Sequence, residues 1–153
     1  MVLELTKWVN AQSVVLLSSC WDTKILLPRF RLLEPISRWV PDALIRRGLQ
    51  TLGPSVIAKR QGVSSEDRCL LVQMIRDVDL AFTRWACYSA LNWESMVPAE
   101  EKRPYQLFAL HGRKDFVIPL VEALWVEVVE DCRHLLPLTH PDAVNAIIRK
   151  ALR

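Results

Sequence analysis

One stretch, from Tyr105 to Asn145, decides how the whole 153-residue chain is interpreted: YQLFALHGRKDFVIPLVEALWVEVVEDCRHLLPLTHPDAVN. It holds two apolar runs, Leu107 to Leu110 and Leu124 to Val129, and each has the length of a single strand. Residues that can do acid–base chemistry come directly after each run. Because parallel strands present their carboxyl ends at one edge of a sheet, these residues would meet there if the two strands are neighbours.

The polar residues after the two runs include an acid and two histidines. His111, Gly112 and Asp115 follow the first run, and His134 follows the second. A carboxylate beside an imidazole orients the ring and stabilises the imidazolium that forms when the ring accepts a proton. The stretch therefore predicts an acid–histidine pair, and the remaining question is which reaction such a pair would serve.

The composition is that of a folded globular domain. Hydrophobic residues make up 51% of the chain, which is ample for a packed core and argues against disorder. The formal net charge is +3, and the basic residues are spread along the chain rather than clustered. We therefore expect no nucleic-acid partner.

The four cysteines, Cys20, Cys69, Cys87 and Cys132, form no CxxC pair and have no metal-ligand spacing. We interpret them as reduced, mostly buried thiols, which favours a cytoplasmic protein over one with disulfides in an oxidising compartment. No apolar run approaches the roughly 20 residues that span a bilayer, so we expect no membrane partner.

A lipid anchor is the alternative interpretation of the N-terminus. Leu17 to Cys20 reads LSSC, which resembles a lipoprotein cleavage box. Acidic and polar residues interrupt the apolar segment that an export signal needs: Glu4, Asn10, Gln12 and Ser13. A protein tethered through Cys20 therefore stays an alternative to the cytoplasmic interpretation.

Short apolar segments and proline positions predict the remaining elements. Val2 to Asn10 is interpreted as the last turns of a helix, and Val14 to Leu17 as a strand buried on both faces. Residues 23 to 97 change to helical periodicity, with prolines that divide the first part into short helices. Asp79 is suited to cap one of these helices. Residues 141 to 153 predict a terminal helix that begins at a proline and ends in basic residues.

Together these elements predict an α/β fold with about three parallel strands, flanking helices and a helical insertion between the first and second strands. Aliphatic strands that are buried on both faces and linked by helices are typical of a parallel sheet. Functional residues on such a sheet lie beyond the carboxyl ends of its strands. This chain has chemically active residues at all three such places: Ser18 to Asp22, His111 to Asp115, and His134.

At these residues the chain resembles the C-terminal half of an α/β-hydrolase. HGRKDFVIP, from His111 to Pro119, resembles the HGxxDxxxP acid loop of that family, and the second run leads to His134, with Pro–Asp and a terminal helix after it. The helical insertion resembles the family's cap. The resemblance implies a partial α/β-hydrolase fold, with residues 1–22 and 98–153 in the core and residues 23–97 in the cap.

The resemblance also implies roles for individual residues. Asp115 would be the acid of a catalytic triad and His134 its general base, with Asp22 as a reserve acid because some relatives place the acid after the preceding strand. The family carries its nucleophile on a G-x-S-x-G turn before the acid. No such motif occurs here, so the chain would contain no nucleophile. No cofactor is implied, and the histidines lack the short ligand spacing of a metal site.

The residues around the implied site leave alternatives open. Ser18, Ser19 and Cys20 lie upstream of the acid and the histidine, but no glycine follows them to make the sharp turn of a nucleophile. His111 is expected to hold the acid loop through a ring hydrogen bond. The family often has glycine just before its histidine, whereas the bulky Arg133 stands there in this chain, and whether it disturbs the histidine loop stays open.

Two functional hypotheses follow. In the first, the chain is part of a truncated or split hydrolase that acts on a small apolar ester-like substrate and pairs with a missing N-terminal half. In the second, it is a non-catalytic remnant or an interaction module of hydrolase fold. If the chain is such a part of a hydrolase, its first strand would present an open, apolar edge, and we expect self-association or poor solubility.

Overall fold

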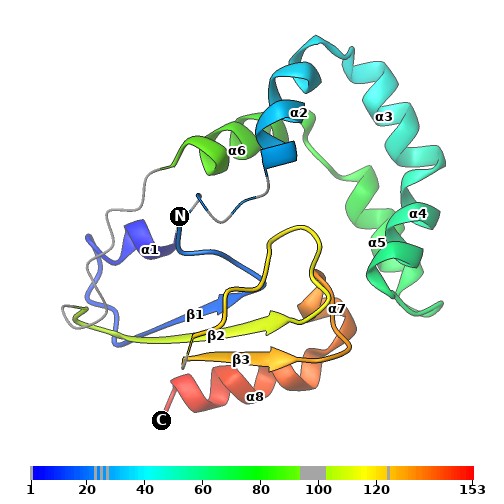
Figure 1. Cartoon of the computed structure of the whole chain (residues 1–153). Coiled ribbons are helices and arrows are strands. Elements are labelled where there is room, and N and C mark those ends of the chain that lie inside the picture. Colours follow the sequence, from blue (N-terminus) through cyan, green and yellow to red (C-terminus); the bar gives the residue numbers. More distant parts are fainter. Residues whose placement is uncertain (1, 23, 25, 27, 94–102, 124) are drawn as a thin grey trace. The chain divides into compact units, whose positions relative to one another are not determined.

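A computed structural model describes residues 2–22, 24, 26, 28–93, 103–123 and 125–153 of the chain. The chain folds as two compact units, one made of residues 1–26 and 94–153 and the other of residues 27–93 (Figure 1). The first unit contains the sheet, and the second is helical. The predicted limits of the cap, residues 23 and 97, lie outside the described residues.

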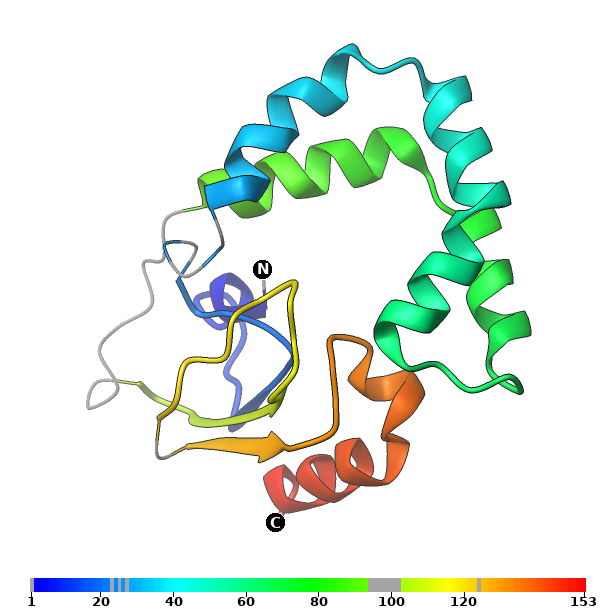
Figure 2. The same cartoon turned by 45° about the vertical axis from the view of Figure 1, so that its right-hand side comes forward.

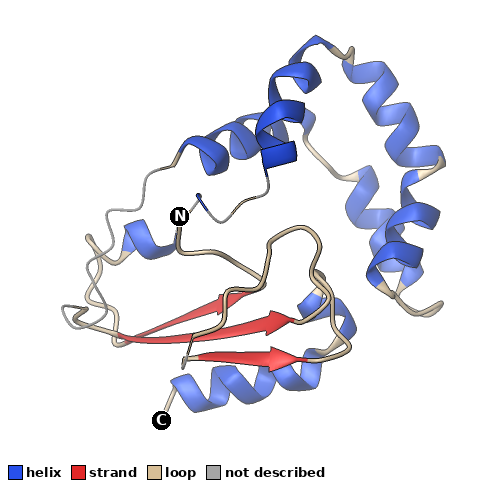
Figure 3. Ribbon diagram, in the orientation of Figure 1, coloured by secondary structure: helices blue, strands red, loops and turns tan. Residues whose placement is uncertain are grey.

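The strands of the first unit form one parallel sheet, drawn in red in Figure 3. In sheet order they are β1 (Ser13–Leu17), β2 (Gln106–Gly112) and β3 (Val126–Val129). Leu17 pairs with Leu110 and Gly112 pairs with Val129, so the strands end near one another at the same edge. The predicted α/β fold with about three parallel strands is confirmed. The predicted start of the third strand, Leu124, lies outside the described residues, and β3 begins at Val126.

Successive side chains of β1 alternate between the two faces of the sheet, as the period of a strand requires. Val15 and Leu17 pack against the apolar cluster beneath the C-terminal helices, while Val14 and Leu16 are buried on the opposite face. Within the part of the chain that the structure describes, β1 pairs with β2 and with no other strand. Its outer edge therefore presents backbone groups to which another strand could pair, and self-association through this edge stays a prediction.

Two helices follow the sheet, α7 (Leu136–Thr139) and α8 (Pro141–Ala151). α8 packs on β1 and β2 and runs antiparallel to the strands (Figure 1). It has a proline and an acid in its first turn and two basic residues in its last, as the sequence predicted. The buried cluster between the helices and the sheet consists of Leu110, Cys132, Leu136, Val144 and Ile147.

The N-terminal helix, α1 (Val2–Leu5), is shorter than the predicted helix, because turns replace it after Leu5. The side chain of Leu3 is buried.

The second unit contains short helices that the prolines help to separate, and α2 and α6 run side by side in it (Figure 2). A proline begins α2, another precedes α3 and a third lies in the first turn of α4. The prediction is wrong at Pro35, which lies inside α2 and does not divide it. No helix within the described residues is both long enough and apolar enough to cross a membrane. The helices are α2 (Pro28–Trp39), α3 (Asp42–Thr51), α4 (Gly53–Gln61), α5 (Arg68–Arg76) and α6 (Leu80–Asn92).

Polar contacts fix α6 within the helical unit. Asp79 caps this helix, since its carboxylate accepts a hydrogen bond from the Phe82 amide at 3.0 Å, as predicted. Arg84 donates to the carbonyl oxygen of Val40 at 2.7 Å and pairs with Asp42 at 2.7 Å. These contacts tie α6 to the turn between α2 and α3.

Two adjacent isoleucines of α8 allow a test of which face of this helix packs against the sheet. The side chain of Ile147 is 1% exposed and that of Ile148 is 38% exposed. We expect Ile147→Ala to lower the free energy of unfolding by about 2 to 5 kcal/mol, because it leaves a cavity. Ile148→Ala should cost about 1 kcal/mol or less. Urea denaturation of both variants checks this, and equal losses would show that the helix is packed in another orientation.

Candidate active site

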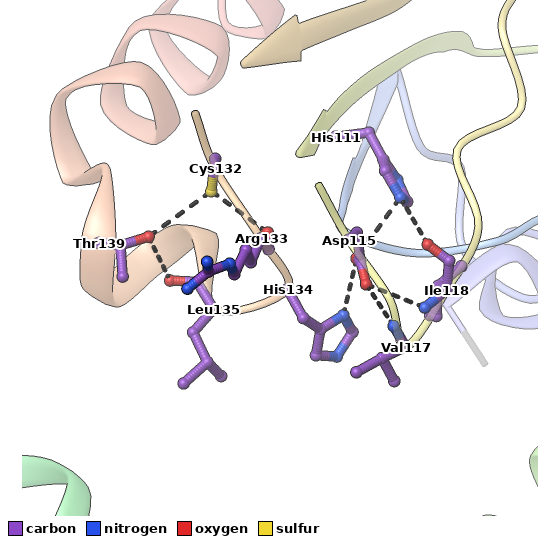
Figure 4. Close-up of polar contacts among 9 residues, drawn as sticks. All are labelled: His111, Asp115, Val117, Ile118, Cys132, Arg133, His134, Leu135 and Thr139. Atoms are coloured by element: carbon purple, nitrogen blue, oxygen red, sulfur yellow. Dashed lines mark hydrogen bonds and ion pairs between the residues drawn. The ribbon is translucent and has the colours of Figure 1, made fainter. Parts of the chain in front are cut away.

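Asp115 and His134 meet at the carboxyl edge of the sheet. Asp115 lies in the turn after β2, and His134 lies in the loop between β3 and α7. The Nδ1 atom of His134 is 2.9 Å from the Oδ2 atom of Asp115, which is hydrogen-bond distance (Figure 4). The structure thus brings together the acid and the histidine that the sequence singled out.

The carboxylate of Asp115 is buried and held by several donors. Its side chain is 0% exposed, and Oδ1 accepts hydrogen bonds from the amides of Val117 at 2.8 Å and Ile118 at 3.0 Å. Burial raises the pKa of Asp115, but the hydrogen bonds from His134 and from these two amides together lower that pKa below its ordinary value. Asp115 is therefore ionised at neutral pH and can stabilise a positive charge on His134.

The imidazole of His134 is oriented by this contact. Because Asp115 is ionised and can only accept, Nδ1 of His134 carries the proton and donates it. The other ring nitrogen, Nε2, points away from Asp115 (Figure 4). With 29% of its side chain exposed, His134 is open enough to exchange a proton with a bound molecule, whereas Asp115 is not. This is the arrangement of a general base and the acid that orients it.

The backbones of the acid loop and the histidine loop are joined directly. The amide of Arg113 donates to Val129 O at 3.0 Å, and the amide of Lys114 donates to Cys132 O at 3.0 Å. A Cβ atom built on Gly112 would lie 2.5 Å from the carbonyl oxygens of both Cys132 and Arg133. Only glycine fits this approach, so Gly112 is a site residue whose role the sequence did not reveal. The sole signal for it was its place in the HGxxD pattern.

Exposed ion pairs reinforce the same junction. Arg113 contacts Glu130 at 2.8 Å and Glu122 at 2.7 Å, and Lys114 contacts Asp131 at 2.6 Å. The bond from Arg113 lowers the pKa of Glu130. Such pairs are screened by solvent, so they help to orient the loops and add little to stability.

Arg133 does not keep His134 from Asp115, since the 2.9 Å contact forms with arginine at this position. The carbonyl oxygen of Arg133 accepts a hydrogen bond from the thiol of Cys132 at 3.2 Å. The thiol is also 3.6 Å from the hydroxyl of Thr139. The loop before His134 is thus held by its own backbone and by the buried thiol.

The reserve acid and the alternative nucleophiles have other surroundings. Asp22 accepts a hydrogen bond from the amide of Lys24 at 2.9 Å, as a loop carboxylate does. Ser18 is buried at the end of β1 with a positive φ of 41°, and its hydroxyl has no partner among the described residues. Burial raises the pKa of Cys20, which disfavours the reactive thiolate.

Neither a metal site nor a known relative accounts for these residues. Within the described residues, no group of three or more histidine, cysteine, aspartate or glutamate side chains could hold a metal ion. Models of known protein families give no match to this chain, and no curated protein matches it. The functional argument therefore rests on the geometry of the site.

Gly112 provides a test of the loop junction. We expect Gly112→Ala to lower the free energy of unfolding by about 1 to 3 kcal/mol, because its Cβ would collide with two carbonyl oxygens. Gly48→Ala is the matched control, since a Cβ at this position in α3 meets nothing within 4 Å. That change should stabilise the helix by about 0.5 to 1 kcal/mol. Urea denaturation measures both, and a Gly112→Ala variant as stable as the wild type would contradict the close approach.

The lowered pKa of Asp115 predicts a specific dependence of stability on pH. A carboxyl whose pKa is lower in the folded chain stabilises the fold above its unfolded pKa of about 3.9. That contribution is lost as the pH falls through the folded pKa. We therefore expect the difference in unfolding free energy between the wild type and Asp115→Asn to shrink as the pH falls below about 4.

The control for this titration is Asp131→Asn, which removes a surface carboxylate paired with the exposed Lys114. It should change the unfolding free energy little at any pH. Denaturant unfolding at a series of pH values makes the comparison. A difference between the wild type and Asp115→Asn that stays the same or grows as the pH falls below about 4 would refute the assigned ionisation.

Proposed function

We propose that Asp115 and His134 are the acid and general base of an α/β-hydrolase-type site that hydrolyses a small apolar ester, with a nucleophile supplied from outside these 153 residues. The observation that carries the proposal is the 2.9 Å contact between the buried carboxylate of Asp115 and the partly exposed ring of His134. The similarity of residues 111–119 to the family's acid loop supports it.

His134, rather than His111, suits the role of base. Both rings approach Oδ2 of Asp115, His134 at 2.9 Å and His111 at 3.5 Å. The side chain of His111 is only 5% exposed, and its Nε2 is bonded to the carbonyl oxygen of Ile118 at 3.0 Å. A base must reach the proton that it abstracts, so the more exposed ring is the one that serves.

The reaction would proceed by acyl transfer. As the nucleophile's oxygen attacks the ester carbonyl carbon, its proton passes to Nε2 of His134, and Asp115 stabilises the resulting imidazolium. His134 then gives that proton to the alkoxide, which departs as an alcohol, and the nucleophile remains acylated. In the second half, His134 takes a proton from water as the water oxygen attacks the acyl carbon. The acid is released, and the proton returns to the nucleophile.

The nucleophile would come from a polypeptide that joins the sheet beside β1. The sequence holds no G-x-S-x-G motif. Within the described residues no strand pairs with the outer edge of β1, which leaves backbone groups for a further parallel strand, and Ser13 to Leu17 contains no charge or proline to discourage pairing.

Reconstitution tests this function. We expect the chain alone to be inactive towards p-nitrophenyl butyrate, and to gain activity when mixed with a polypeptide that carries the nucleophile elbow and oxyanion loop of an α/β-hydrolase. Asp115→Asn in the active mixture should lower the rate by about 10⁴-fold, because the histidine loses the group that orients it. His140→Ala is the matched control and should leave the rate unchanged, since His140 bonds to Thr139 and not to Asp115.

Two results would decide against the hydrolase. The first is a mixture in which both polypeptides are folded and associated but no ester is cleaved, which would favour the interaction module. The second is cleavage that persists in Asp115→Asn and His134→Ala alike, which would place the chemistry elsewhere. A serine-directed fluorophosphonate probe identifies the chain that carries the nucleophile.

A further inference from the structure

The buried ring of His111 lies beside the Asp115–His134 pair without belonging to it. It stands on β2, the strand that leads into the acid loop, and its Nε2 is 3.0 Å from Ile118 O and 3.5 Å from Asp115 Oδ2 (Figure 4). A carbonyl oxygen can only accept a hydrogen bond. Nε2 of His111 therefore carries a proton and donates it, whatever the charge of the ring. This ring hydrogen bond confirms the expectation that His111 holds the acid loop.

The bond from His111 acts on the same turn that holds the carboxylate. On one side, the Ile118 carbonyl accepts from His111; on the other, the amides of Val117 and Ile118 donate to Oδ1 of Asp115. Pro119 follows, and a residue before proline is restricted to extended conformations, which leaves Ile118 few ways to turn. Holding the Ile118 carbonyl in place therefore also holds the neighbouring amides of Val117 and Ile118 in place. These two amides bind Oδ1 of Asp115 and so determine that Oδ1 faces the loop.

We propose that His111 is the positioning residue of the Asp115–His134 pair: its Nε2–H holds the carbonyl oxygen of Ile118, and thereby the turn from Val117 to Pro119, so that Oδ1 of Asp115 meets the amides of Val117 and Ile118 and Oδ2 meets Nδ1 of His134. The catalytic meaning of this role rests on the proposed function. The contact itself exists within this chain and needs no nucleophile, so it can be measured on the intact protein alone.

The first measurement uses the wild-type chain. The ¹⁵N chemical shifts of a histidine ring report which of its nitrogens carries a proton, and all three histidines of the chain can be distinguished by substitution. We expect His111 to be protonated at Nε2. A ring protonated at Nδ1 alone would overturn the proposal, and this result does not depend on whether any variant folds.

The second measurement uses His111→Leu, which removes the donor, and His111→Gln, whose amide can replace it. In His111→Leu we expect the Nδ1–H proton of His134 to exchange with water about fivefold faster or more, because its acceptor is no longer held. We also expect the pKa of Asp115, measured through its carboxyl carbon, to rise towards the ordinary value. His111→Gln should restore both signals, and His140→Gln, which alters a ring that bonds to Thr139, should change neither.

A folded His111→Leu chain with an unchanged His134 signal and an unchanged Asp115 pKa would refute the positioning role. A general loss of stability without these local changes would assign His111 to packing alone and would also refute it. If the signals change as expected while no reconstituted mixture cleaves ester, the positioning role stands and the proposed function fails. If ester is cleaved while the signals stay unchanged, the proposed function stands and the positioning role fails.

Discussion

The contact between the backbone of Gly112 and the backbone of Cys132 and Arg133 is the constraint on which the site depends. Neighbouring strands lie about 4.8 Å apart. Here a side chain on Gly112 would lie 2.5 Å from two carbonyl oxygens, so its absence lets the loop after β3 cross the end of β2. The bond from the Lys114 amide to Cys132 O then fixes the crossing. His134 follows Cys132 by two residues, so this crossing places its ring beside Asp115.

The negative charge of Asp115 makes the junction of the two loops suited to acid–base chemistry. A carboxylate removed from water costs several kcal/mol unless donors replace the water. In this chain the donors are two loop amides and the ring of His134, with His111 bonded to the next carbonyl. All of these groups except His134 belong to residues 111–118. The acid loop and the strand residue before it therefore supply most of the hydrogen bonds that offset the cost of burying the carboxylate. The histidine loop adds the ring whose protonated form the buried charge can stabilise, and that is the property a general base needs.

Much of this site could be predicted from the sequence, because its information is local. Aliphatic runs followed at once by polar residues indicated parallel strands with Asp115 and His134 at their carboxyl ends, and the structure places both residues there. The role of Gly112 could not be predicted, because a close approach between segments about twenty residues apart depends on tertiary packing. The effect of Arg133 could not be predicted for a related reason. The contact between His134 and Asp115 forms with arginine at this position, and the junction between the two loops is made by backbone atoms.

The strength of the coupling between Asp115 and His134 tests the central claim most directly. It is measured by a double-mutant cycle, in which Asp115→Asn and His134→Gln are made singly and together and the free energy of unfolding is determined at neutral pH. The account predicts a coupling of about 1 to 3 kcal/mol, as for a hydrogen bond to a buried charge. The same cycle between Asp115 and His140 should give a coupling near zero. A coupling near zero for Asp115 and His134 would contradict the account, because the two residues would then not form the pair on which the site is built.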